Sequence, residues 1–230
     1  MKRFYEEVSV SPGDGGFQVF LDGRPVRTPG GKPLALPTEK LAEAIAAEWR
    51  AQGDEVVPTS MPLLRLANTA IDGIAANRAA TIDAILRFGD NDLLCYRAHE
   101  PPALAGRQAE GWDPWLAWAG RRLGAHLTIV YGLNHADQPA EALAALHEAV
   151  EAQDDYTLAG LHVIASITGS VVLALAAAAG EVTASQAFAL SRIDETYQAE
   201  RWGQDGEAEA RANRLAEEVD RAFTLVALSR

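Results

Sequence analysis

Apolar and polar residues alternate near the start of the chain in the way that is typical of β-strands. A β-rich run at 4–10 ends at the turn-forming cluster 11–16, and a second run at 17–21 ends at Asp22-Gly23. Because this dipeptide tolerates positive φ angles, it predicts a tight type I′ hairpin leading into a third strand at 24–28. The sequence therefore predicts a small antiparallel sheet, which needs a covering layer because so small a sheet is not stable alone.

From Pro37 onward the apolar residues recur at helical spacing. Thr38 suits the N-cap of a helix that ends near Gly53, and periodic stretches continue to residue 88. A loop-rich stretch is expected at 89–111, and Asp113-Pro114 predicts a helix start with the aspartate as cap. Residues 127–131 are expected to form a strand or an extended connector. Further helices are predicted at about 138–152, 155–179, 183–201 and 205–227.

These segments predict the α+β class in its segregated form, a small N-terminal antiparallel β domain followed by a larger α-helical domain. We place a β-rich domain with one helix at 1–60 and a helical domain at 61–230, with the change between them falling anywhere between residues 55 and 80. Residues 156–180 carry no formal charge and are long enough to cross a bilayer. The stretch is rich in alanine and is flanked by acids, so a buried helix is the preferred interpretation.

The composition excludes several classes of function. The chain has 20 basic and 32 acidic residues, a net charge of −12, which disfavours nucleic acid and anionic membrane surfaces as partners. The single cysteine, Cys95, cannot form an intramolecular disulfide, and the N-terminus has no apolar segment typical of a secretory signal. We therefore expect a cytoplasmic protein without membrane insertion.

Patterns typical of an enzyme are missing from the sequence. There is no phosphate-binding loop and no serine elbow, and Cys95 lies between apolar neighbours that favour an unreactive core thiol. We predict no cofactor and no catalytic residue. We also predict no metal site, because no ligand spacing relates the five histidines, which are His99, His126, His135, His147 and His162.

Two acidic clusters remain. Asp90 and Asp92 faintly resemble a cation loop but lack its ligand pattern, so a capping or solvated role is preferred. From Asp194 to Asp220 nine acids accompany three arginines, giving −6. One interpretation is a solvated helix face with pairs such as Glu207–Arg211. The other is a surface for a basic, partly apolar protein, because Tyr197 and Trp202 lie among the acids.

Several short segments of the chain, taken in order, form a recognisable set. They are Phe4-Tyr5-Glu6, Gly16-Phe17, Leu21-Asp22-Gly23-Arg24, Glu48-Trp49, Asn68-Thr69-Ala70-Ile71-Asp72, the run Asp90 to Arg97, Trp112-Asp113-Pro114, Leu190-Ser191-Arg192, Tyr197-Gln198 and Trp202-Gly203. Together these segments resemble one family, the assembly chaperones of the F-type ATP synthase that hold the free α subunit (the ATP-twelve chaperone family). The resemblance covers nearly the whole chain, except that residues 127–138 carry no clear family signature.

The resemblance implies a non-enzymatic role, in which the chain binds the unassembled α subunit until the β subunit takes its place. It places the family's functionally important acid at Glu195, with its neighbour Asp194 as the alternative, and we add Tyr197 and Trp202 as partner-binding residues. It implies a packing role for Trp49. The other matched positions that we expect to be structural are Asn68, Asp72, Tyr96 and Trp112.

The resemblance also bears on location. Eukaryotic relatives act in the mitochondrial matrix and begin with a targeting extension that this sequence lacks, so a bacterial, cytoplasmic protein is expected.

Two other functions stay open: an acid–base enzyme that uses Asp194 and Glu195, and a general protein-interaction scaffold. Adjacent helical residues point about 100° apart, which disfavours joint action of the two acids on one bond.

Overall fold

The structure is a computed structural model that describes residues 1–132, 136–203 and 205–230. His135, one of the five histidines considered above, lies outside this range. The chain divides into two compact units. The first contains residues 1–78, 154–160 and 224–230, and the second contains residues 79–153 and 161–223. The predicted boundary at residue 60 stays a prediction.

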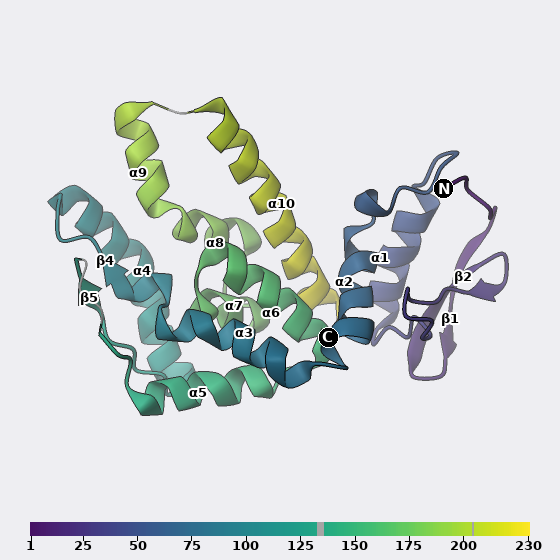
Figure 1. Ribbon diagram of the computed structural model, residues 1–230, viewed down its shortest axis with the longest axis horizontal. Coiled ribbons are helices and arrows are strands. Elements are labelled where there is room, and N and C mark those ends of the chain that lie inside the picture. The colour runs from purple at the N-terminus through teal and green to yellow at the C-terminus, as the bar shows by residue number, and fades with distance from the viewer. Residues whose placement is uncertain (133–135, 204) are drawn as a thin grey trace. The chain divides into compact units, whose positions relative to one another are not determined.

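A three-stranded antiparallel sheet comes first in the chain and the remainder is mostly helical, which confirms the α+β class (Figure 1). The elements are β1 (Val8–Gly13), β2 (Gly16–Leu21), β3 (Arg24–Pro25), α1 (Glu39–Arg50), the 3₁₀ helix η1 (Pro58–Ser60), α2 (Pro62–Asn68), the π-helix η2 (Thr69–Ile74), α3 (Arg78–Asp90), the 3₁₀ helix η3 (Leu93–Cys95), β4 (Tyr96–Arg97), α4 (Pro102–Leu123), β5 (Val130–Tyr131), α5 (Ala140–Glu151), α6 (Asp155–Thr168), α7 (Val171–Ala178), α8 (Ala184–Ser191), α9 (Ile193–Trp202) and α10 (Gly206–Leu228).

The hairpin predicted at Asp22-Gly23 is confirmed. Both residues have positive φ angles, 47° and 75°, and they join β2 to β3 as a type I′ turn does. The first strand differs from its prediction, because β1 continues through Pro12 and pairs to the end of the hairpin with Gly13 opposite Gly16. Proline is tolerated there because β1 lies at the edge of the sheet, in the order β1-β2-β3.

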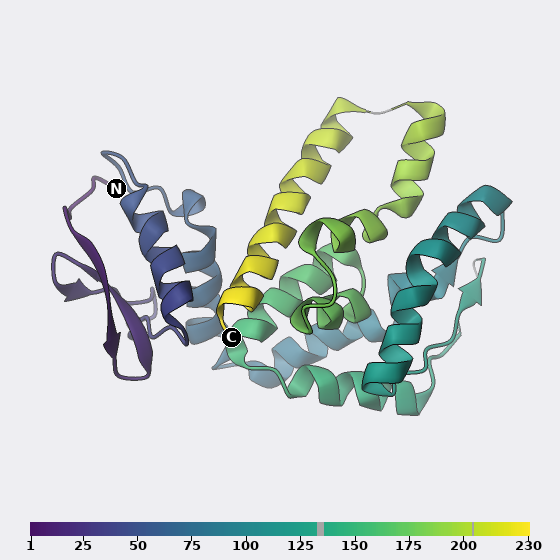
Figure 2. The same ribbon diagram turned by 180° about the vertical axis from the view of Figure 1, so that it is seen from behind.

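Helix α1 provides the cover that the small sheet needs, and it packs on β1 and β2 (Figures 1 and 2). Its apolar side chains Leu41 and Ile45 are fully buried. Trp49 is 8 % exposed and meets the ring of Tyr5 edge-on at 5.4 Å, while the Tyr5 hydroxyl donates to the Trp49 carbonyl at 2.7 Å. Trp49 therefore ties the N-terminal segment to α1.

Two carboxylates connect distant parts of the first unit. The Glu48 carboxylate of α1 accepts hydrogen bonds from the backbone N–H groups of Leu63 and Leu64 at 2.8 and 2.9 Å. It therefore caps α2, whose own N-cap residue contributes no side-chain hydrogen bond. Asp72 accepts a hydrogen bond from the Thr28 hydroxyl and another from a backbone N–H in the neighbouring turn, both at 2.8 Å.

In the second unit, the prediction for residues 89–123 is wrong, because α4 begins earlier than the sequence indicates. The helix runs unbroken from Pro102 and contains Pro114 in its interior, so Asp113 is not its cap. The side chains of Leu104, Gln108 and Trp112 recur every four residues and are all buried. The free energy gained by burying this stripe exceeds the cost of the single backbone hydrogen bond that a proline removes.

The long uncharged stretch is also divided. The sequence predicted one helix at 155–179, but the chain breaks after α6, where Gly169 has a φ of 70°, and Ser170 caps the new helix α7. The predicted helix at 183–201 is likewise two helices, α8 and α9, which meet at Arg192. Across the ranges that the structure describes, every helix is too short or too polar to cross a bilayer.

Candidate functional site

Helix α9 carries the acids that the sequence singled out, and its contacts with α4 decide which way each one points. Gly111 of α4 leaves room for Ile193, because a β-carbon there would come within 2.7 Å of the Ile193 Cδ1 atom. The Gln108 side-chain amide donates to Asp194 at 2.6 Å. Arg107 forms an ion pair with Glu200 at 2.8 Å. Asp194 and Glu200 are therefore engaged with α4.

Tyr197 lies on the same side of α9 and is only 4 % exposed. The guanidinium groups of Arg107 and Arg201 lie 5.2 and 4.3 Å from the centre of its ring. Its hydroxyl is buried and makes no hydrogen bond with any part of the chain that the structure describes. Tyr197 thus belongs to the packing beneath α9, whereas Trp202 at the end of the helix is 77 % exposed.

Glu195 has a different environment from Asp194. It pairs with Arg192 at 2.7 Å, and its side chain keeps 47 % of its surface exposed. Both residues of this pair line a hollow of about 720 Å³ that they share with the first turns of α10. Figures 1 and 2 show α9 and this part of α10 as two arms. We call this feature the α9–α10 hollow; its other lining residues are Asp205, Glu207, Ala208, Ala210, Arg211, Ala212, Arg214 and Leu215.

Two arginines of the hollow are not among the site residues that the sequence predicts. Arg211 and Arg214 are three residues apart on α10, and both are exposed. Neither forms an ion pair with a residue in the described ranges, so the expected Glu207–Arg211 pair is absent there. Their spacing was the available signal, since residues three apart lie on one face of a helix.

The remaining positions that we expected to be structural are not among the residues that line the hollow. The Trp112 indole N–H donates to the Leu190 carbonyl at 2.8 Å, and its ring lies 5.1 Å from the Arg97 guanidinium. The Tyr96 hydroxyl donates to the side chain of Asn91 at 3.0 Å. Asn68 is half-buried, and its carbonyl oxygen has no hydrogen-bond partner among the described residues.

Asp92 is a strongly perturbed carboxylate, and it has the capping role that the sequence favoured. It is fully buried and accepts hydrogen bonds of 3.0 Å each from the Leu94 N–H, the Ser170 hydroxyl and the Val172 N–H. It therefore caps the starts of η3 and α7. Burial raises its pKa from 3.8 to about 6, because desolvation outweighs the hydrogen bonds that favour the charged form.

Cys95 is the buried thiol that the sequence predicted. Burial, together with the nearby Asp92 charge, raises the pKa of this thiol to about 12, which suppresses the reactive thiolate. No group of three or more histidine, cysteine or acidic side chains within residues 1–132, 136–203 and 205–230 is arranged to hold a metal ion.

Comparison with known proteins identifies the family. The sequence profile described as ATP12 chaperone protein matches residues 2–120, which is more than half of the chain. The chain belongs to the ATP12 chaperone family. This match extends from the N-terminal segment into α4, so it ends before the α9–α10 hollow.

Individual proteins match over a longer range. The mitochondrial atp12 protein of Schizosaccharomyces pombe is 26 % identical over 215 residues, covering 88 % of this chain and 74 % of its own. The crystal structure of Atp12 from Paracoccus denitrificans is 44 % identical with a TM-score of 0.96, covering 100 % of this chain and 98 % of its own. A putative chaperone from Agrobacterium tumefaciens is 45 % identical with a TM-score of 0.92, covering 100 % of this chain and 86 % of its own.

As a member of the ATP12 family, the chain is a chaperone. The resemblance described in the sequence analysis connects this family with the assembly of ATP synthase. The bacterial sources of the two solved structures agree with the bacterial type expected from the sequence. Since both structures cover the whole chain, the similarity of fold includes the helices that form the α9–α10 hollow.

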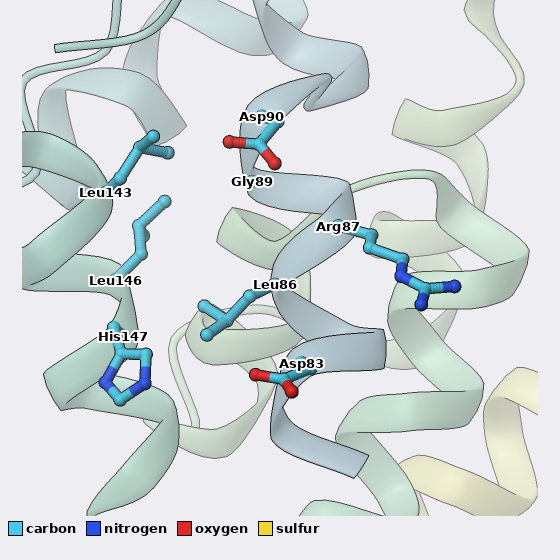
Figure 3. Close-up of a pocket in the computed structure, with 8 residues that line it drawn as sticks. All are labelled: Asp83, Leu86, Arg87, Gly89, Asp90, Leu143, Leu146 and His147. Carbon is cyan, nitrogen blue, oxygen red and sulfur yellow. The ribbon is translucent and has the colours of Figure 1, made fainter. Parts of the chain in front are cut away.

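A second hollow of about 340 Å³ lies between α3 and α5 (Figure 3). The side chains of Leu86, Leu143 and Leu146 line it, and Arg87 also belongs to its lining, although its side chain extends away from the three leucines. Gly89 also lines it, and a β-carbon there would lie 3.3 Å from Leu146. None of the residues singled out from the sequence as partner-binding lies here, so the α9–α10 hollow is the better candidate site.

Proposed function

We propose that this ATP12 family member assists assembly of the catalytic sector of the F-type ATP synthase by binding the unassembled α subunit. The β subunit then competes for the same surface of α and releases the chaperone. The observation that carries the proposal is the α9–α10 hollow, in which Glu195 remains exposed while Asp194 is engaged by Gln108. Glu195 is therefore the acid we assign to partner contact.

The physical need for such a cover arises from how the catalytic ring is built. A free subunit exposes apolar surface that its neighbour will later bury, and patches of more than a few hundred Å² promote unwanted association. A contact of standard size buries about 800 Å² on each partner, which is sufficient to shield such a patch. We assign Trp202 as an apolar anchor for this contact, because its side chain is 77 % exposed beside the hollow-forming helices.

Tyr197 takes a supporting part in this proposal instead of direct contact. Two guanidinium groups, including that of Arg107 on α4, lie close to its ring, and the residue is 4 % exposed, so it holds α9 in place against α4. Glu195 contributes mainly to the rate and specificity of association, as exposed interfacial charges generally do.

The proposal includes no catalysis and no cofactor. An acid–base enzyme is less well supported because Asp194 and Glu195 face different neighbours, Gln108 and Arg192 respectively. A general scaffold predicts many clients where the chaperone predicts one. We further propose that the chain acts in the bacterial cytoplasm, where newly made α subunits are present before assembly.

Capture of clients from a lysate, followed by mass spectrometry, tests this function. The wild-type chain is expected to recover α selectively, and added β is expected to release it. Glu195→Lys is expected to weaken capture of purified α while preserving the circular-dichroism spectrum. Glu209→Lys is the matched control, since Glu209 is exposed on α10 but does not line the hollow. Recovery of many unrelated proteins, or equal capture by both variants, would count against the proposal.

A further inference from the structure

We infer that Arg211 and Arg214 form a carboxylate-binding wall of the α9–α10 hollow, which receives acidic side chains of the α subunit. This inference rests on the proposed function and specifies the chemistry of the segment that is bound. That segment presents acids to Arg211 and Arg214 of α10, opposite the Arg192–Glu195 pair of α9.

The first support is that both guanidinium groups are available. Arg211 and Arg214 share one face of α10, are exposed, and form no ion pair with residues in the described part of the chain. A guanidinium presents a planar fork of donors that matches a carboxylate in a bidentate manner. Binding a carboxylate here therefore requires no intramolecular ion pair of these arginines to be broken.

The second support is the surface between the arms. Ala208, Ala212 and Leu215 lie on the same part of α10 as the two arginines and line the hollow with small or apolar side chains. Nearly all of the first two turns of α10 are exposed, and its first buried side chain is Val219. The charged groups thus flank an apolar strip, an arrangement that accommodates the stem of a partner side chain as well as its charge.

The charged residues in and around the hollow indicate which class of macromolecule it binds. The lining contains three arginines and three acids, which are Arg192, Arg211, Arg214, Glu195, Asp205 and Glu207. Across the wider segment from residue 194 to residue 220, acids predominate, with nine acids and three arginines. A nucleic acid would be repelled by this surrounding charge. Both signs are present on each side, with Arg192 and Glu195 on α9 and with Arg211, Arg214 and Glu207 on α10. A protein segment that itself carries both signs matches this lining.

The size of the hollow sets how much of the partner it takes. Its volume of about 720 Å³ lies within the range of roughly 300–1,000 Å³ that is common for small-molecule sites. A few side chains of the α subunit therefore enter it, and the rest of the contact lies on the surrounding surface.

The test measures the affinity of the purified full-length chain for purified unassembled α subunit. The double variant Arg211→Glu/Arg214→Glu is expected to weaken binding by about tenfold or more, and the loss should shrink at high salt. Arg211→Lys/Arg214→Lys keeps the charge but loses the fork, so an intermediate loss is expected. Arg221→Glu is the control, because Arg221 is exposed on α10 outside the hollow.

Circular dichroism and thermal unfolding establish that each variant is folded. The lysine double variant keeps the inference testable if the glutamate double variant is unstable. Binding by both double variants within about twofold of wild type would overturn the inference and leave the proposed function intact. If wild type itself fails to bind α, the proposed function fails, and the inference fails with it.

Discussion

The buried carboxylate of Asp92 should make the stability of this protein depend on pH in a predictable direction. Replacing Asp92 with asparagine removes the titrating group while keeping the shape of the side chain. Because Asp92 accepts hydrogen bonds through both of its oxygens, an asparagine leaves one backbone N–H, that of Leu94 or Val172, without an acceptor. That loss costs on the order of 1–3 kcal/mol and does not itself depend on pH.

The magnitude of the pH effect is set by the shifted pKa. Burial raises the pKa of Asp92 from 3.8 to about 6, so the folded chain holds this proton more tightly than the unfolded chain. The resulting stabilisation is fully present below about pH 3.8 and is lost as the pH rises through about 6. Between about pH 7.5 and pH 5, the wild type should gain on the order of 1 kcal/mol from this group alone.

Urea unfolding of wild type and Asp92→Asn at these two pH values isolates the effect. The free energy of unfolding of each protein is measured at both pH values, and the change in one is subtracted from the change in the other. Contributions from other titrating groups cancel, because both proteins share them. A difference between wild type and variant that stays constant with pH would refute the assignment of the raised pKa to Asp92.

Other predictions concern backbone conformation, thiol reactivity and core packing. Gly16→Ala should destabilise the chain by more than about 2 kcal/mol, because the φ of Gly16 is 138° and the added carbon would lie 2.2 Å from a backbone oxygen. Gly23→Ala is the control in the same urea assay: nothing lies within 4 Å of the added carbon, so it should cost only about 1–2 kcal/mol. Cys95, whose pKa is raised to about 12, should resist alkylation in the folded chain and react only in denaturant, and rapid labelling of folded protein would contradict its burial. Trp112→Phe should lower the free energy of unfolding by about 2–3 kcal/mol, since the indole N–H bond to Leu190 is lost; an unchanged midpoint in thermal unfolding would show that this bond contributes little.

The parts of the fold that the sequence predicted well are those specified by neighbouring residues. The Asp22-Gly23 hairpin depends only on two positive φ angles, and Thr38 caps α1 through a hydrogen bond to the N–H of Leu41. Such signals lie within a few residues of the feature they determine, so the sequence reveals them.

Errors arose where a distant contact determined the local structure. Pro114 was interpreted as a helix start, but packing along α4 carries the helix through it, and Asp113 pairs with Arg97 at 2.8 Å. The break before α7 depends on Asp92, which lies 78 residues before Ser170 in the chain and accepts hydrogen bonds at the new helix start. Spacing along one segment does not contain this information.

The candidate site was predicted in part. The sequence drew attention to the acids of α9 but could not distinguish Asp194 from Glu195, since the distinction depends on Gln108 in another helix. The local spacing predicts a pair between Arg211 and Glu207 and indicates no role for Arg214. The hollow that both arginines line depends on how α9 and α10 are arranged in space, which local spacing does not contain.

The cap that Glu48 supplies to α2 links the opening of two helices. The N–H groups of Leu63 and Leu64 are protected by a carboxylate on α1, so they become free to exchange with solvent when α1 loosens as well as when α2 frays. Hydrogen exchange at these two amides should therefore report on the last turns of α1. In this chain, the exchange of amides at the start of α2 therefore depends on whether the end of α1 is folded.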